Sequence, residues 1–188
     1  MDVTLCIFFT TLVLFHSAEF FFVAWIHPEK LRWESWLISR AYCLAVLCAV
    51  VEYVLECYWL SYPKDVPAVQ ALGIGLIVIG EAIRATAILT AGANFTHRVA
   101  VVKTPSHRFV SHGIYKSCRH PGYLGWFLWC LGTQVLLANP VCLVLASIIV
   151  WRFFADRIAA EEFHLTRFFP EEFPPYRERV RTYIPFIH

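Results

Sequence analysis

The feature that most constrains this chain is a series of long apolar runs, over residues 3–26, 41–60 and 66–93. A helix of about 20 apolar residues crosses the hydrocarbon core of a bilayer, which is about 30 Å thick. The runs therefore predict transmembrane helices over residues 3–26, 41–60 and 68–92. Each run contains few ionisable side chains, and those are His16, Glu19, Glu52, Glu56, Glu81 and Arg84.

A fourth apolar run begins after His120, and residues 121–151 contain neither a charged residue nor a histidine. One helix over this run would be roughly 46 Å long, which is too long for a single span. Asn139 and Pro140 interrupt the run, and proline favours the first turn of a new helix. We therefore predict two helices, over residues 122–138 and 140–158, joined by a tight turn.

The composition supports an all-α integral membrane protein with about five transmembrane helices in one domain, residues 1–188. The chain is 59% hydrophobic and 16% charged, whereas a soluble domain is about 45–50% apolar and about 25% charged. A net charge of +2 is too small to indicate nucleic acid. The seven cysteines include no CxxC motif and indicate neither a disulfide framework nor a zinc site.

The basic residues predict which side of the membrane each loop faces. If successive spans cross the membrane in alternating directions, every lysine and arginine except Lys64 and Arg84 lies on the same side. Cytosolic segments of membrane proteins carry an excess of lysine and arginine. We therefore expect a cytosolic C-terminus and an N-terminus that faces away from the cytosol.

Two cytosolic segments carry the candidate chemistry. Residues 94–120 form a long polar loop, and such loops commonly carry function or are disordered. Its histidines lack regular metal spacing and an adjacent carboxylate or thiolate set, so we expect no metal. In the last helix, Arg157 and Glu161 share one face, as do Arg152 and Asp156. Ordinary surface ion pairs are the simplest interpretation of these charges, although their place beside a bilayer favours a functional one.

Several segments together resemble the isoprenylcysteine carboxyl methyltransferase family, from about residue 75 to the C-terminus. The pattern RHPxYxG followed by EE also occurs in other membrane methyltransferases and in some sterol reductases. The specific resemblance therefore rests on the further segments, and the short N-terminal region resembles compact plant-type members. The matching segments are "NFTH" at 94–97, "SHGIYKSCRHPGYLGW" at 111–126, "GTQVLLANP" at 132–140, "WRFFADRIAAEE" at 151–162 and "YIPFI" at 183–187.

The resemblance implies S-adenosylmethionine as the cofactor, with Arg157 as the arginine that binds the substrate carboxylate. Arg157 and Glu161 are thus the implied catalytic residues. Gly122 stands where serine is common, and at Ala100, where some members carry glutamine, only a backbone contact is implied. The implied cofactor contacts are Ala100, His107, Arg108, Phe109, Val110, Tyr115, His120, Pro121, Gly122, Tyr123 and Glu161.

The implied reaction is methyl transfer to the α-carboxylate of a C-terminal prenylated cysteine in CaaX-processed proteins such as small GTPases. The implied location is the endoplasmic reticulum membrane, with the site facing the cytosol. The "RHPGY" segment at 119–123 suits such a site, because a polar loop meets an apolar helix there. An α-carboxylate has a pKa of about 3.5, so it is ionised near neutral pH and needs no general base.

Three alternatives stay open at this point. A phospholipid N-methyltransferase would need a base for its amine nucleophile rather than an arginine for a carboxylate. A membrane sterol reductase would need a nicotinamide cofactor, and a non-enzymatic scaffold or transporter would need neither. The sequence assigns no role to Glu19, although interhelical polar contacts are the simplest role for Glu52, Glu56, Glu81 and Arg84. We expect "FFPEEFPPYRERV" at 168–180 to form an amphipathic tail over the site.

Overall fold

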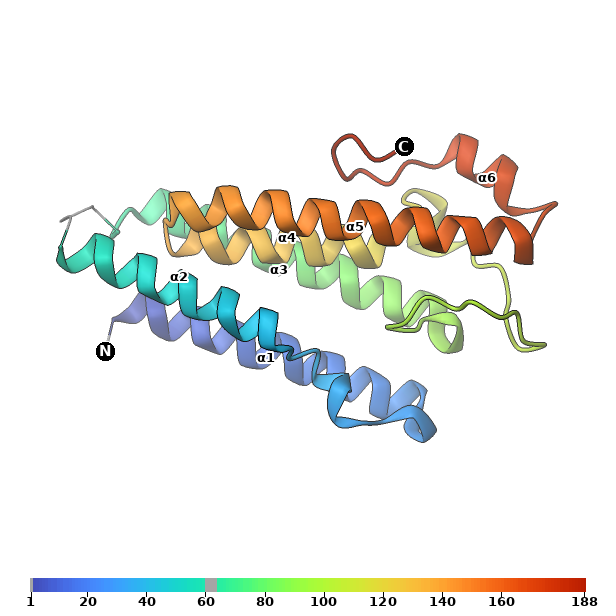
Figure 1. Ribbon diagram of the computed structural model, residues 1–188, viewed down its shortest axis with the longest axis horizontal. Coiled ribbons are helices and arrows are strands. Elements are labelled where there is room, and N and C mark those ends of the chain that lie inside the picture. Colours follow the sequence, from blue (N-terminus) through green and yellow to red (C-terminus); the bar gives the residue numbers. More distant parts are fainter. Residues whose placement is uncertain (1, 60–63) are drawn as a thin grey trace. The chain divides into compact units, whose positions relative to one another are not determined.

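The fold is all-helical in a computed structural model that describes residues 2–59 and 64–188 (Figure 1). Leu60, the last residue of the predicted second span, lies outside these residues. The described residues form no β-strand, although an isolated bridge pairs Cys118 with Arg181. The predicted all-α class is confirmed. The α-helices are α1 (Val3–Ile26), α2 (Arg40–Tyr58), α3 (Pro67–Ala91), α4 (Pro121–Leu136), α5 (Pro140–Phe168) and α6 (Phe173–Arg179).

Prolines begin both helices of the fourth apolar run, α5 at its predicted first residue and α4 one residue before its predicted start. Pro121 is the first residue of α4 and Pro140 is the first residue of α5. A proline at a first helical position lacks only an N–H group that would have no partner within the helix. Helix α5 then continues past residue 158, the end of the predicted span, as far as Phe168.

The chain divides into two compact units, which we describe separately. The first unit comprises residues 1–79 and 128–148, and the second comprises residues 80–127 and 149–188. The boundaries fall within α3, α4 and α5, so each of these helices contributes to both units. The single domain expected from the sequence stays a prediction.

In the first unit, small residues and aromatic side chains bring α1, α3 and α4 together. Phe15 is buried and stacks on Trp129, with 4.1 Å between the ring centroids. A Cβ atom on Gly73 would lie 2.4 Å from the backbone nitrogen of Leu136. Only glycine allows so close an approach of two helix backbones.

The turn between α4 and α5 is held by a group of polar contacts that we call the Lys64 cluster. Lys64 pairs with the carboxylate of Glu56, and both residues are buried. Its ammonium group also lies 3.0 Å from Asn139 Oδ1 and within 3.1 Å of the carbonyl oxygens of Leu137 and Ala138. Asn139 in turn donates to the carbonyl of Ala49. The turn is therefore fixed by side chains as well as by its backbone.

Glu52 supplies a further contact at this turn. Its two carboxylate oxygens accept hydrogen bonds from the backbone N–H groups of Val141 and Cys142, at 2.7 and 2.6 Å. The first N–H groups of a helix have no partner within the helix. Glu52 of α2 therefore caps α5, which is the interhelical role expected from its sequence.

Three helical segments are long and apolar enough to cross a membrane, over residues 3–26, 33–58 and 67–94 of the described chain. Helix α4 has 16 residues and rises only about 24 Å, less than the thickness of the bilayer core. In α5 the run without charged residues ends at Trp151. The structure therefore supports a membrane protein with three candidate spans, and the count of five stays a prediction.

Candidate active site

A cavity in the second unit gathers the predicted cofactor residues. Its walls come from the loop between α3 and α4, from the first turn of α4, from the charged half of α5 and from α6. Three separate segments of the sequence therefore supply the predicted residues to one place. All the positions implied as cofactor contacts line it, namely Ala100, His107, Arg108, Phe109, Val110, Tyr115, His120, Pro121, Gly122, Tyr123 and Glu161.

Tyr123 connects the two residues implied as catalytic. Its hydroxyl donates to Glu161 Oε2 and accepts from Arg157 Nε, the latter at 2.9 Å. The Arg157 guanidinium lies over the Tyr123 ring, 5.5 Å from its centroid, and Nη2 donates to the carbonyl of His97. Arg157 therefore reaches the cavity wall through Tyr123.

The other predicted pair on α5 behaves differently. Arg152 Nε lies 3.1 Å from Asp156 Oδ2, and the two side chains are 71% and 63% exposed. This is the ordinary surface ion pair that the sequence favoured for both pairs. Arg157 and Glu161 instead belong to a partly buried hydrogen-bonded chain through Tyr123.

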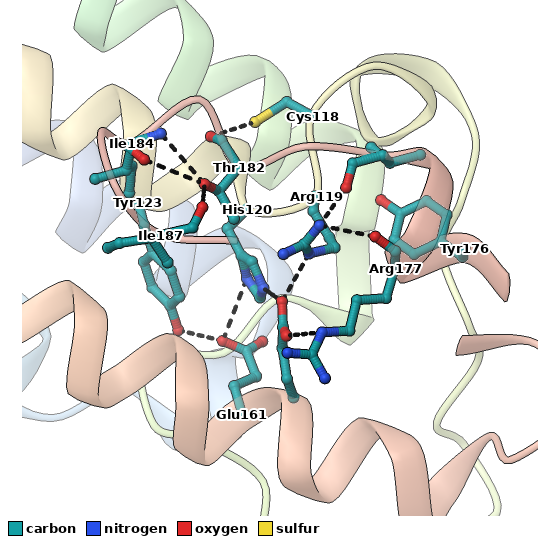
Figure 2. A network of polar contacts seen from close by, with 12 residues as sticks. Cys118, Arg119, His120, Tyr123, Glu161, Tyr176, Arg177, Thr182, Ile184 and Ile187 are labelled. Carbon is teal, nitrogen blue, oxygen red and sulfur yellow. Dashed lines mark hydrogen bonds and ion pairs between the residues drawn. The ribbon is translucent and has the colours of Figure 1, made fainter. Parts of the chain in front are cut away.

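The His120 ring lies between the carboxylates of two consecutive glutamates of α5 (Figure 2). Its Nε2 atom is 3.0 Å from Glu162 Oε1, whereas Nδ1 is 3.8 Å from Glu161 Oε2. The ring also stacks on Tyr123, with 5.5 Å between centroids and an interplanar angle of 10°. A carboxylate at hydrogen-bond distance places a proton on Nε2, because an ionised carboxylate only accepts.

Glu162 is the centre of a second group of contacts, which we call the Glu162 cluster. Arg119 Nε donates to Oε1 at 2.7 Å, Arg177 Nε donates to Oε2 at 2.9 Å, and His120 is the third partner. Burial alone would raise the pKa of Glu162, but the hydrogen bonds and charges of His120 and Arg119 outweigh it and hold the pKa below its ordinary value. Glu162 is therefore an anion held by two guanidinium groups and the His120 imidazole.

The sequence motifs did not assign a role to Glu162 or to Arg119. Glu162 is the second glutamate of the "EE" motif, and Arg119 is the arginine of "RHPGY". The sequence could have indicated them only through their position next to the predicted site residues Glu161 and His120. Their mutual contact spans 43 positions of the chain, so only the fold reveals it.

The C-terminal segment packs on the site through the same arginine. Arg119 Nη1 donates to the carbonyls of Arg177 and Val180, and its backbone N–H donates to the carbonyl of Arg181. In α6, Phe173 and Tyr176 are buried against Phe109, whereas residues 177–179 are exposed. One face of α6 is therefore buried and the other is exposed, as expected of an amphipathic tail.

Arg84 contacts the first turn of α4. Its Nη1 atom donates to the carbonyl of Gly122 at 2.9 Å, and its guanidinium lies 4.9 Å from the centroid of the Trp126 ring. A Cβ atom at Gly122 would lie 3.1 Å from the Phe95 ring. The serine that is common at this position in the resembled family would therefore require a small shift of Phe95.

No group of three or more histidine, cysteine, aspartate or glutamate side chains in the described part of the chain could hold a metal ion. The loop histidines His107 and His120 line the cavity, and His120 pairs with Glu162.

Comparisons with known proteins agree on one family. The model of the isoprenylcysteine carboxyl methyltransferase (ICMT) family matches residues 73–167. A protein-S-isoprenylcysteine O-methyltransferase of Mus musculus is 42% identical over 179 residues, which cover 94% of this chain and 63% of that protein. Protein-S-isoprenylcysteine O-methyltransferase B of Arabidopsis thaliana is 38% identical over 181 residues, which cover 96% of this chain and 92% of that protein.

A solved structure gives the same result at the level of the fold. The structure of the eukaryotic intramembrane Ras methyltransferase ICMT superposes with a TM-score of 0.92 at 38% sequence identity. The match covers 96% of this chain and 65% of that one. The chain therefore spans a little under two thirds of the mouse protein and of the solved structure, but nearly all of the Arabidopsis protein.

Proposed function

The chain belongs to the isoprenylcysteine carboxyl methyltransferase family, and from this we propose that it methylates the α-carboxylate of a C-terminal prenylated cysteine with S-adenosylmethionine. The proposed substrates are CaaX-processed proteins, small GTPases among them. The observation that carries the proposal is the cavity in the second unit, where all the implied cofactor positions meet beside the Glu161–Tyr123–Arg157 chain.

The residues of the cavity fit S-adenosylmethionine by their chemistry. The carboxylate of Glu161 suits a positively charged sulfonium, because opposite charges attract strongly in a site of low dielectric constant. Phe95, Phe109 and Phe168 supply aromatic surface against which a planar adenine can stack. When bound, the cofactor supplies an electrophilic methyl group.

The protein's own task is then to position the substrate carboxylate. We assign this to Arg157, whose planar guanidinium suits the two oxygens of a carboxylate. The hydrogen bonds to Tyr123 and to the His97 carbonyl fix the orientation of Arg157 before substrate arrives. Such pre-organisation matters because an ionised carboxylate needs alignment rather than a base.

We further propose five spans, with α4 and the apolar part of α5 as the fourth and fifth. The turn at residues 137–139 and its Lys64 cluster would close the hairpin between them. In α5 the exposed residues Val141, Val144, Leu145 and Ile148 form a stripe at helical spacing, which suits contact with lipid. The proposed location is the endoplasmic reticulum membrane. The cavity would face the cytosol, because it lies on the side that carries most of the basic residues.

The alternatives are less well supported. A phospholipid N-methyltransferase would have to remove a proton from an amine. Arg157, beside Tyr123, cannot serve as that base because its guanidinium stays protonated. A sterol reductase catalyses a different reaction, whereas the relatives to which the chain is similar are methyltransferases. No comparison favours either class.

A binding and activity assay tests the proposal. Purified protein should bind S-adenosylmethionine but not NADPH in isothermal titration, and should transfer labelled methyl groups to acetyl-farnesylcysteine. Phosphatidylethanolamine serves as the competing acceptor. Methylation of the phospholipid but not of the prenylcysteine would contradict the proposal, as would binding of NADPH alone.

A further inference from the structure

Two bulky residues of the last segment are held in an unusual backbone conformation. Tyr183 and Phe186 have φ angles of 61° and 62°, in the left-handed region that bulky residues rarely adopt. The two residues are 60% and 87% exposed, so their rings gain little from burial within the protein. Strained residues persist where the surrounding structure fixes them, and they gather at functional sites. Strain and exposure together indicate a partner that the protein itself does not supply.

The residues between and beside these two are firmly fixed by the fold. Thr182 and Ile184 are only 1% and 2% exposed. The Thr182 hydroxyl donates to the carbonyl of Ile187 at 2.6 Å and accepts from the backbone N–H of Ile184 at 3.3 Å (Figure 2). Tyr183 and Phe186 are therefore exposed on a fixed turn rather than on a loose end of the chain.

A hydrogen bond joins this segment to the residue at which the uncharged part of α5 ends. Trp151 Nε1 donates to the carbonyl of Pro185 at 2.6 Å. Before it, Ile149 is 64% exposed and continues the stripe of α5 that suits contact with lipid, whereas Arg152 after it is charged and exposed. Tryptophan is enriched where a membrane span meets water. Residues 183–187 therefore lie at the proposed boundary between bilayer and cytosol.

The charge of the segment matches a membrane surface. Residues 179–188 include Arg179 and Arg181, both exposed, and contain no aspartate or glutamate. Arginine side chains beside a bilayer are attracted to the anionic headgroups of its cytoplasmic leaflet. Aromatic rings are enriched in the same headgroup layer. Lipid headgroups thus match both the rings and the charges of the segment.

We propose that residues 179–187 form a lipid-binding surface, with the rings of Tyr183 and Phe186 in the headgroup layer and the two arginines at its anionic surface. The inference rests on the proposed function, because it takes the apolar part of α5 as a span. It also has a consequence for the cavity, since the carbonyl of Arg181 accepts from the backbone N–H of Arg119 at 2.9 Å. Lipid that holds this segment would also hold the cavity wall at Arg119.

A photoreactive side chain identifies what the rings touch. Phe186 is replaced by p-benzoylphenylalanine, which keeps an aromatic ring. The protein is then reconstituted into nanodiscs of phosphatidylcholine and phosphatidylserine and irradiated. Mass spectrometry should find lipid adducts at this position. The same replacement at Tyr183 should also give lipid adducts, and it provides a second variant if the first does not fold.

Phe163 is the matched control for this probe. It is another exposed aromatic residue, at 59%, but it lies about 18 Å beyond Trp151 along α5, at a rise of about 1.5 Å per residue. The probe at Phe163 should therefore give little lipid adduct. Equal yields of lipid adduct at Phe163 and Phe186 would overturn the proposal, as would adducts of Phe186 with a second copy of the protein in place of lipid.

The arginines give an independent measurement. The adducts at Phe186 should be richer in phosphatidylserine than the nanodisc as a whole, by up to about fivefold for each arginine. Arg181→Gln removes an exposed charge but keeps the backbone contacts, so this enrichment should fall. Adducts with the composition of the nanodisc in both proteins would overturn the anionic part of the proposed surface.

Methylation of acetyl-farnesylcysteine by the unsubstituted protein in the same nanodiscs separates this proposal from the proposed function. Methylation, with no lipid adduct from the probe at Tyr183 or at Phe186, overturns the lipid-binding surface and leaves the proposed function standing. Lipid adducts at both positions, with no methylation, support the surface and overturn the proposed function.

Discussion

The Lys64 cluster of the first unit and the Glu162 cluster of the second both bury opposite charges, but they differ in how completely the charges are paired. The Lys64 ammonium has a carboxylate, an amide oxygen and two carbonyls within 3.1 Å. Glu162 instead accepts from three donor residues, and the buried Nη2 atom of Arg119 has no partner in the described chain. The Lys64 cluster therefore fixes a turn, whereas the Glu162 cluster joins α5 and α6 to the loop before α4 at the cavity wall.

The largest expected effect comes from breaking the Lys64 cluster. Lys64→Ala would leave the buried Glu56 carboxylate without its cation, at a cost of about 3–5 kcal/mol. We expect a large fall in the thermal unfolding temperature in detergent, and unchanged S-adenosylmethionine affinity in the protein that stays folded.

The matched control replaces both charges together. The double variant Glu56→Leu and Lys64→Met should recover most of the lost stability, because a buried ion pair can often be exchanged for apolar residues of similar volume. Equal unfolding temperatures for the single variant and the wild type would show that the cluster does not hold the turn.

The second prediction concerns acid and the Glu162 cluster. The pKa of Glu162 is lowered in the folded protein, so its stabilisation is present above the unfolded-state pKa of about 4.3 and is lost as the pH falls through the folded value. Thermal unfolding from pH 7 to pH 3 should show this loss. Glu162→Gln should be less stable at pH 7 and lose less on acidification.

The effect of Glu162→Gln at pH 7 should be smaller than that of Lys64→Ala, because Arg177 is half exposed and water can solvate it. Glu172→Gln, an exposed carboxyl of the same unit, serves as the control. Parallel acid profiles for the wild type and Glu162→Gln would assign the acid loss to other carboxyls.

A third prediction separates Arg157 from Arg152, both of which lie in α5. Arg157→Ala should weaken capture of acetyl-farnesylcysteine by about 10- to 150-fold, as expected for a lost charged hydrogen bond of about 1.5–3 kcal/mol, and should also slow turnover. Cofactor affinity should persist. Arg157→Lys should recover little, because lysine lacks the planar fork of arginine.

Arg152→Ala is the control for that prediction, since Arg152 forms an exposed ion pair on the same helix. Such pairs contribute about 0–1 kcal/mol, so kcat/KM should stay near the wild-type value. Equal losses in both variants would remove Arg157 from the substrate site.

The smallest effect is expected for Tyr123→Phe, which keeps the ring stacked on His120 but removes the hydroxyl shared by Glu161 and Arg157. A single hydrogen bond is worth about 0.5–1.5 kcal/mol, so cofactor affinity and kcat/KM should each fall by about 2- to 13-fold. An unchanged kcat/KM would mean that Arg157 is oriented without this link.

Helix boundaries were readable from the sequence because proline leaves few local choices. Pro140 begins α5 where expected, Pro121 begins α4 one residue before the predicted start, and the apolar runs predicted α1, α2 and α3. The number of spans could not be decided in the same way, because α4 is short and α5 carries charged residues well before its end. Hydropathy alone does not show how a short or charged helix lies in a bilayer.

The sequence by itself determined the all-α class, the family and the set of positions that share one cavity, since motifs around "RHPGY" and "EE" carry this information locally. The roles of those positions stay a prediction. Only the tertiary structure decided how their charges are paired. The bridge from Glu161 to Arg157 through Tyr123, and the sharing of Glu162 by Arg119 and Arg177, join groups far apart in the chain. Such pairings depend on distances of a few ångströms that the packing of α4, α5 and α6 sets.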